Sequence, residues 1–295
     1  MSGILSTATV ASVGLTCKAF LNLGYCGSVT VNGLTNLVRA LESESRNRGQ
    51  GVVTVSNHIS TLDDPVTWGV LPKRYYFSSR TTRWALGASD IIFTNPLFST
   101  FFTLGQTLET FRGKGIYQPA VDTAINKLNR GGWVHLYGEG KVNQPLEYPR
   151  NQSSVFPHSR CLPRFKWGVG RMLIEPKALP VVIPMWLSGF DQLMPEGRPF
   201  PNKYLPRPGA HLSVTFGEPV ASELIQGVLE NTRHPINIEP DNKHAMGWVG
   251  KQDSNARNND EQQLISVRTK VTALVHDAVE ALGRTVAGDS LGSNR

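Results

Sequence analysis

The sequence is poor in the residues from which disulfide frameworks and transition-metal sites are built. Its 295 residues hold 3 cysteines, at positions 17, 26 and 161, and no two of them are spaced as a CxxC pair. The 7 histidines are scattered without an HExxH motif, and no GxxxxGK[ST] motif is present. A disulfide scaffold is thereby excluded, and zinc binding and nucleotide hydrolysis are disfavoured. We expect no metal and no cofactor.

Acidic residues are outnumbered by basic ones. The chain has 23 Asp and Glu against 30 Lys and Arg, which gives a formal net charge of +7. Such an excess favours an anionic partner, either a nucleic acid or a phospholipid surface. The basic residues are dispersed, and no recognised nucleic-acid motif accompanies them. An anionic membrane surface is therefore the expected partner, and nucleic acid is not.

The N-terminal stretch is almost free of charge, since Lys18 is the only charged residue before Arg39. It lacks the arginines of a transit peptide and the cationic start of a secretory signal. Ser, Thr, Gly and Asn dilute it too much for a convincing bilayer span. Val10, Val13, Cys17 and Phe20 fall at helical spacing, which suits a helix on a membrane surface, although a partly ordered arm remains the alternative. We assign residues 1–32 to an N-terminal membrane-associated arm.

Strand-like and helical segments alternate along the rest of the chain. Predicted strands cover Val52–Val55, Arg74–Phe77, Thr107–Phe111, Trp133–Tyr137, Pro180–Trp186 and His211–Phe216. Predicted helices cover Gln118–Leu128, Lys166–Glu175 and, as an amphipathic C-terminal helix, Glu261–Leu282. The alternation predicts an α/β fold, a single domain over residues 33–295 with a mixed, largely parallel sheet flanked by helices. Polar segments at 144–163 and 231–262 are expected to be insertions.

The segment "VSNHISTLDDP" at residues 55–65 is the strongest chemical signal. His58 follows a β-branched run, so it is expected at the carboxyl end of a strand, where open α/β sheets bind ligands. His58 and Asp63 are about 140° apart on an ideal helix, so a straight helix would separate them. They meet only if His58 lies in the turn and Asp63 in the first turn of the next helix. A carboxylate on one imidazole nitrogen would leave the other as a general base. An isolated H-x-x-x-x-D pattern is more often a capped strand–helix junction.

Further motifs make the pattern specific. "NHISTLDD" resembles the N-H-x-x-x-x-D signature of the glycerolipid acyltransferase family. "YGEGKVN" at 137–143 resembles the family's F-P-E-G block, with Gly138 in place of the usual proline. "RFKWGVGR" at 164–171 and "VVIPMW" at 181–186 match later segments of its transacylase members. The resemblance extends from about Gly33 to Gly217 and includes the final helix. It implies a glycerolipid-acyltransferase-like fold.

The resemblance also implies roles for residues of this chain. His58 and Asp63 are the expected catalytic pair, and backbone N–H groups near the start of the helix after His58 are expected to stabilise an oxyanion. Glu139 is expected to bond a glycerol hydroxyl or hold a basic residue, beside a tight turn at Gly140. Arginine and lysine side chains suit lipid phosphates, Arg164 and Arg171 above all. The expected substrate-binding residues are Asn57, Ser60, Asp64, Arg112, Glu139, Gly140, Lys141, Asn143, Arg164, Lys166 and Arg171.

Five of the 12 phenylalanines lie within residues 90–111. Asn95 and Pro96 are typical of a helix start and Gly105 of a helix end. The helix between them would be about 14 Å long, too short for a bilayer of about 30 Å. Its aromatic face could pack in the core, which is usual for such a stripe. We favour contact with one leaflet through Phe93, Leu97, Phe98, Phe101 and Phe102.

The resemblance implies a phospholipid–lysophospholipid transacylase that remodels cardiolipin from monolysocardiolipin. Its partners would be phospholipids and lysophospholipids, and an oligomer is compatible with the sequence. It would work in mitochondria, peripheral or monotopic on membranes facing the intermembrane space. Ester exchange is nearly balanced in free energy, so neither ATP nor a thioester is required. The alternatives are an acyl-CoA-dependent lysophospholipid acyltransferase and a non-catalytic peripheral membrane protein.

Overall fold

A central sheet organises the computed structural model, which describes residues 2–151, 159–166, 168–230 and 254–292. Its seven strands lie in the order β1-β7-β6-β2-β5-β3-β4. β6 and β7 are antiparallel, and the other neighbours are parallel. The predicted mixed, largely parallel sheet is confirmed. The strands are β1 (Ser28–Asn32), β2 (Val52–Ser56), β3 (Trp84–Ala88), β4 (Thr107–Thr110), β5 (Trp133–Tyr137), β6 (Val181–Ser188) and β7 (His211–Phe216).

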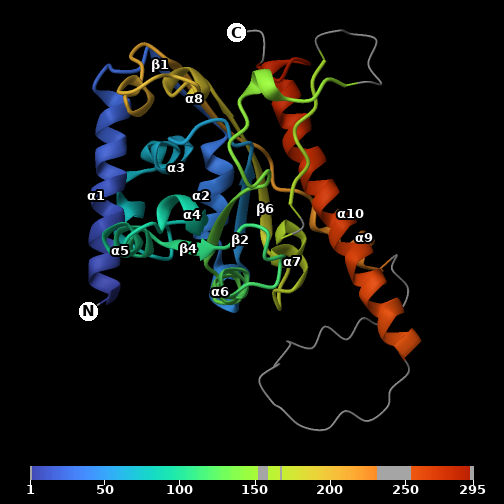
Figure 1. Cartoon of the computed structure of the whole chain (residues 1–295). Coiled ribbons are helices and arrows are strands. Elements are labelled where there is room, and N and C mark those ends of the chain that lie inside the picture. The colour runs from blue at the N-terminus through green and yellow to red at the C-terminus, as the bar shows by residue number, and fades with distance from the viewer. Residues whose placement is uncertain (1, 152–158, 167, 231–253, 293–295) are drawn as a thin grey trace.

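Helices cover both faces of the sheet, with α1 and α10 on opposite sides (Figure 1). α10 packs against β6, α7 and α9, whereas α1 packs against α3, α5 and the turns η2 and η3. The α-helices are α1 (Ser2–Asn22), α2 (Leu34–Glu42), α3 (Asp63–Val66), α4 (Ser89–Ile92), α5 (Pro96–Leu104), α6 (Pro119–Leu128), α7 (Gly168–Ile174), α8 (Phe190–Leu193), α9 (Ser222–Glu230) and α10 (Ser254–Ala287). The 3₁₀ turns are η1 (Glu44–Arg48), η2 (Thr67–Val70), η3 (Lys73–Phe77), η4 (Pro145–Glu147) and η5 (Asn202–Tyr204).

One predicted strand is wrong. Arg74–Phe77 lies in η3, where Tyr75 and Tyr76 are both buried. The Tyr76 hydroxyl donates to the carbonyls of Trp68 and Leu71 at 2.9 and 3.1 Å. The Tyr75 N–H donates to the Pro72 carbonyl at 3.0 Å, an i→i−3 turn bond that an extended strand cannot make.

Other boundaries also differ from the predicted ones. The sequence patterns did not indicate β1 or β3. α10 begins at Ser254 and not near Glu261, so the expected polar insertion at 231–262 is helical at its C-terminal end. Residues 231–253 of that insertion, and residues 152–158 of the one at 144–163, lie outside the described residues.

The N-terminal helix α1 forms part of the core. Ala11, Cys17 and Leu21 are buried, and the ammonium group of Lys18 donates to the carbonyls of Gly69 and Leu71 at 3.1 and 2.9 Å. Residues 3–22 are nevertheless long and apolar enough, by length and composition, to cross a membrane. The polar residues that make a bilayer span unconvincing in the sequence therefore do not bring this helix below the length and hydropathy of a span.

Strand register brings the sequence motifs to one edge of the sheet. β2 is buried along its whole length, as expected for a parallel strand covered on both faces. Ser56, its last residue, pairs with Tyr137 of β5 and with Met185 of β6. Because these strands are parallel, the residues that follow Ser56 and Tyr137 emerge side by side.

Candidate active site

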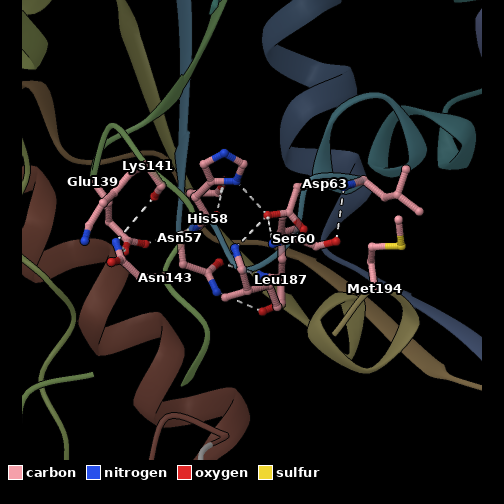
Figure 2. A network of polar contacts seen from close by, with 12 residues as sticks. Asn57, His58, Ser60, Asp63, Glu139, Lys141, Asn143, Leu187 and Met194 are labelled. Carbon is pink, nitrogen blue, oxygen red and sulfur yellow. Dashed lines mark hydrogen bonds and ion pairs between the residues drawn. The ribbon is translucent and has the colours of Figure 1, made fainter. Parts of the chain in front are cut away.

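His58 and Asp63 form a hydrogen-bonded pair at the carboxyl end of β2. His58 Nδ1 lies 2.9 Å from Asp63 Oδ2, and the His58 side chain is 20% exposed whereas that of Asp63 is fully buried. Figure 2 shows the imidazole above the carboxylate. His58 lies in the turn and Asp63 opens α3, which is the arrangement that the sequence spacing required. No described residue hydrogen-bonds Nε2, so this nitrogen is left for a substrate.

The turn between the two residues is organised around the Asp63 carboxylate. The N–H groups of Ile59 and Ser60 donate to Asp63 Oδ2 at 2.7 and 2.9 Å. Burial raises the pKa of Asp63, and the hydrogen bonds from His58, Ser60 and Ile59 oppose that rise. The same turn binds the N–H of Leu62 through Ser60 Oγ at 3.1 Å. The N–H groups of Ile59, Ser60 and Leu62 are thus engaged within the loop, and Ser60 stabilises the turn.

Glu139 holds the histidine loop in place. Its Oε1 accepts the backbone N–H of His58 at 2.9 Å, and its Oε2 accepts the side-chain amide of Asn143. The backbone N–H of Asn143 in turn donates to the His58 carbonyl at 2.7 Å. Burial raises the pKa of Glu139 to about 8. Both oxygens of the Glu139 carboxyl group accept hydrogen bonds from protein. Glu139 and Asn143 therefore fix the backbone of His58, whereas the sequence suggested that Glu139 contacts glycerol.

The chain turns sharply immediately after Glu139. Gly140 has φ +71°, a left-handed conformation that disfavours any residue with a Cβ. The backbone reverses here and brings Asn143 back beneath Glu139 (Figure 2). The predicted role of Gly140 in a tight turn is confirmed.

Asn57 joins β2 to β6. Its amide donates to the Leu187 carbonyl at 2.9 Å and accepts the Leu187 N–H at 2.8 Å. Asn57 is fully buried. This asparagine therefore fixes the start of the His58 loop, and its side chain has no exposed surface for the substrate contact expected from the sequence.

Three residues near the site were not identified from the sequence. Arg83 on the approach to β3 donates to Asp64 and to the Gly105 carbonyl, so Asp64 is neutralised by protein. The Tyr137 ring stacks on His58 with centroids 4.1 Å apart. Gln144 donates to the carbonyls of Ile59 and Met194. No spacing in the sequence indicates these contacts, which join segments far apart in the chain.

Of the basic residues expected to contact lipid phosphates, four are exposed and one, Arg171, is buried. Lys141, Arg164 and Lys166 are exposed, and the Lys166 methylenes lie against the Gly140 turn. Lys166 also donates its N–H to the Gly138 carbonyl at 2.8 Å, which keeps these cations beside the site. Arg112 is half exposed and lies 3.6 Å from Asp90.

Arg171 was expected to contact a lipid phosphate, but the structure places it in ion pairs inside the protein. Its side chain is only 7% exposed and pairs with Glu175 at 2.6 Å and Asp122 at 2.9 Å. Its Nε donates a second bond to Glu175 at 2.8 Å, and its Nη1 donates to the Ile116 carbonyl at 2.9 Å. This guanidinium cross-links α6 and α7, and four of its five N–H donors are engaged by protein.

The aromatic helix α5 begins and ends as predicted. Asn95 Oδ1 accepts the N–H of Phe98 at 3.0 Å, which caps the helix start. Phe98 and Phe101 are 49% and 45% exposed, and Leu97 is 75% exposed. Phe102 is partly covered and contacts the rings of Phe93 and Phe101. The exposed side chains are not in the core, so the core-packing alternative fails for them.

The chain is similar to known proteins of one family. The acyltransferase family model matches residues 28–188. The chain is 34% identical over 218 residues to a Dictyostelium discoideum protein named taffazin, covering 72% of this chain and 69% of that protein. It is 35% identical over 217 residues to Drosophila melanogaster tafazzin, covering 74% of this chain and 52% of that protein.

An enzyme of another name is similarly related. The Arabidopsis thaliana N-acylphosphatidylethanolamine synthase is 34% identical over 242 residues, covering 79% of this chain and 78% of that protein. The 1-acyl-sn-glycerophosphate acyltransferase of Thermotoga maritima shares the fold, with a TM-score of 0.50, 16% identity, and 94% of this chain and 79% of that chain covered. The non-catalytic alternative is set aside, because the family model and the relatives indicate an acyltransferase enzyme. The chain belongs to the acyltransferase family, and tafazzins are among its relatives.

Proposed function

We propose that this enzyme transfers fatty acyl chains between phospholipids and lysophospholipids without coenzyme A, and that it forms cardiolipin from monolysocardiolipin. The observation that carries the proposal is the pair formed by His58 Nδ1 and the buried Asp63 carboxylate at 2.9 Å, with no hydrogen bond from the described residues to Nε2. This arrangement suits proton transfer to and from a lipid hydroxyl. The tafazzin relatives support the choice of substrate class.

The reaction uses His58 twice. Nε2 accepts the proton of the lysolipid hydroxyl while that oxygen attacks the ester carbonyl of the donor phospholipid. The tetrahedral intermediate collapses with cleavage of the donor C–O bond, and the imidazolium returns its proton to the departing glycerol oxygen. The products are the acylated acceptor and a new lysophospholipid. Asp63 holds the ring orientation and stabilises the transient imidazolium.

Cations beside the site suit anionic acceptors. Lys141, Arg164 and Lys166 are exposed and follow the Glu139 turn or the loop packed on it. Lysine and arginine both bind phosphate oxygens effectively. A lysocardiolipin headgroup carries two phosphates, which matches a group of cations better than a single one.

An exchange assay tests the proposal directly. The purified chain is incubated in vesicles with monolysocardiolipin and acyl-labelled phosphatidylcholine, with and without coenzyme A, and in a parallel reaction with labelled acyl-CoA as the donor. From phosphatidylcholine we expect label in cardiolipin at equal rates with and without coenzyme A, and about 10²- to 10⁴-fold less with His58→Ala. Transfer only from an acyl-CoA donor would identify the acyl-CoA-dependent alternative instead.

The Arabidopsis relative supports a second candidate function, acyl transfer to the amine of phosphatidylethanolamine. The same histidine would then deprotonate an ammonium group and not a hydroxyl. Mass spectrometry distinguishes the two functions when phosphatidylethanolamine and monolysocardiolipin compete as acceptors. N-acylated product in excess of cardiolipin would favour the second candidate.

The proposed location is a mitochondrial membrane facing the intermembrane space, with the protein seated on one leaflet. Support comes from the tafazzin relatives and from the exposed apolar side chains of α5. The first turns of α1 extend this apolar surface, since Ile4 and Leu5 are 78% and 56% exposed. Ser6 Oγ donates to the Leu104 carbonyl at 2.8 Å, which places the start of α1 beside the end of α5.

A further inference from the structure

One face of the His58 ring lies against an aromatic side chain. The Tyr137 ring at the end of β5 is stacked on the imidazole, with centroids 4.1 Å apart and an interplanar angle of 22°. Strand pairing fixes this contact, because Tyr137 lies opposite Ser56, two residues before His58. The Nδ1 edge of the imidazole meets Asp63. The ring is therefore held at one edge and on one face.

The Tyr137 hydroxyl takes no part in this contact network. It is buried, and no described residue hydrogen-bonds it. Burial, followed by the nearby Asp64 and Asp63 carboxylates, raises the pKa of Tyr137 well above its ordinary value, so the phenol is neutral. What Tyr137 presents to His58 is the face of an uncharged ring.

We propose that Tyr137 is a positioning residue that stabilises the imidazolium form of His58 through its ring face and not through its hydroxyl. The inference rests on the proposed role of His58 as the general base. The face of an aromatic ring carries negative quadrupole charge and attracts a cation stacked on it. The attraction is greatest when His58 holds the acceptor's proton, so it lowers the barrier to transfer.

The other charged groups around the ring do not replace this contact. Asp63 acts on the Nδ1 edge, and Glu139 acts on the backbone N–H of His58. The His135 ring is nearly perpendicular to that of Tyr137, with centroids 4.5 Å apart, and its burial, with Arg83 and His58 nearby, lowers its pKa well below the ordinary value. This neighbour of the tyrosine is thus a neutral imidazole, and Arg83 is already paired with Asp64.

Three variants of the full chain in vesicles separate the ring from the hydroxyl. Tyr137→Phe keeps the ring face and should retain activity within about twofold. Tyr137→Leu and Tyr137→Met remove the face and should lower kcat by roughly 3- to 30-fold, the range of a cation–π contact, with KM unchanged. The acidic limb of their pH–rate profile should shift to lower pH, because the imidazolium loses a stabilising neighbour.

Controls distinguish this effect from simple loss of packing. Phe216→Leu replaces a buried aromatic residue of β7 and should leave the pH profile unmoved. Equal losses in Tyr137→Phe and Tyr137→Leu would assign the function to the hydroxyl and overturn the proposal. A normal rate and profile in Tyr137→Leu or Tyr137→Met would also overturn it. His58→Ala is measured alongside, since activity there would instead refute the proposed base.

Discussion

The backbone N–H of His58 donates to the carboxylate of Glu139 at 2.9 Å, across 81 positions of the sequence. The two motifs of the chain are therefore joined directly, and one holds the other in place. Because the Asn143 N–H also reaches the His58 carbonyl, the histidine peptide unit is bonded on both sides. The orientation of the proposed general base thus depends on a residue that need not touch substrate.

Removing this contact should lower activity through misplacement of the base. We expect Glu139→Ala to reduce kcat by about 10- to 100-fold, since small misplacement of a catalytic group is costly, and to lower the melting temperature. Glu139→Gln keeps one acceptor for the His58 N–H and should lose less. Steady-state kinetics and thermal unfolding check both variants. Identical kcat losses for Gln and Ala would point to a direct role of the carboxylate in the reaction.

The raised pKa of Glu139 predicts a stability change with pH. The carboxyl has a pKa of about 8 in the folded protein against an ordinary value of 4.5, so the folded state retains its proton over this interval while the unfolded state releases it. The free energy of unfolding should therefore fall as pH rises from about 4.5 to 8. Melting curves across this range should show a shallower fall for Glu139→Gln. A slope equal to that of the unmodified protein would show that other groups, such as Asp63 and Asp191, dominate.

Loss of the catalytic pair should abolish turnover without unfolding the protein. His58→Ala should reduce acyl transfer by about 10²- to 10⁴-fold, the usual contribution of a general base. Asp63→Asn should also be severe, because the amide orients the ring without stabilising its charge. Exchange assays paired with circular dichroism test this. A folded His58→Ala variant with near-normal turnover would remove His58 from the mechanism.

The two arginines of the segment 164–171 should behave differently. Arg164 is exposed, so Arg164→Gln should weaken transfer to anionic lysolipids more than to zwitterionic ones while stability is retained. Arg171→Gln should instead destabilise the fold by about 1–3 kcal/mol, because it removes hydrogen bonds to Glu175, Asp122 and the Ile116 carbonyl while Arg268 still pairs with Glu175. Acceptor-specific rates and chemical denaturation separate the effects. Equal losses on both lipid classes for Arg164→Gln would argue against phosphate contact.

The exposed aromatic residues of α5 should hold the protein to a leaflet. Burying a phenylalanine side chain fully is worth about 1.5–3 kcal/mol, and the positive net charge adds attraction to anionic lipid. Phe98→Ser with Phe101→Ser should therefore weaken vesicle binding in flotation assays with little change in melting temperature. A double variant that floats normally but melts much earlier would show that the two rings pack inside the protein.

The sequence predicted the reactive pair well because its signal is local. The β-branched run before His58, the turn after it and the acidic helix start all lie within a short segment, and the structure has them as expected. Long-range contacts carried no comparable signal. Nothing near Glu139 indicates that its carboxylate meets the backbone of His58, and nothing near Tyr137 indicates the stack.

Two errors have identifiable physical causes. The strand β3 reads "WALGA", whose alanines and glycine have little strand propensity, and it forms because β4 and β5 supply neighbours on each side. Arg171 was misread although a clue was available: Glu175 lies four positions on, which is helical ion-pair spacing. Glu175 also pairs with Arg268 at 2.7 Å, and that partner could not be read from spacing.

The packing of α1 decides how a soluble form of this enzyme must be engineered. A Cβ at Gly14 would lie 2.7 Å from the Tyr76 ring, and one at Gly69 would lie 2.8 Å from the Cys17 backbone. The helix packs closely on the rest of the domain. Deletion of residues 1–22 would therefore remove buried side chains of the core and expose Tyr76 to solvent. Solubility is better sought by redesigning the outward residues Ile4 and Leu5, with the helix left in place.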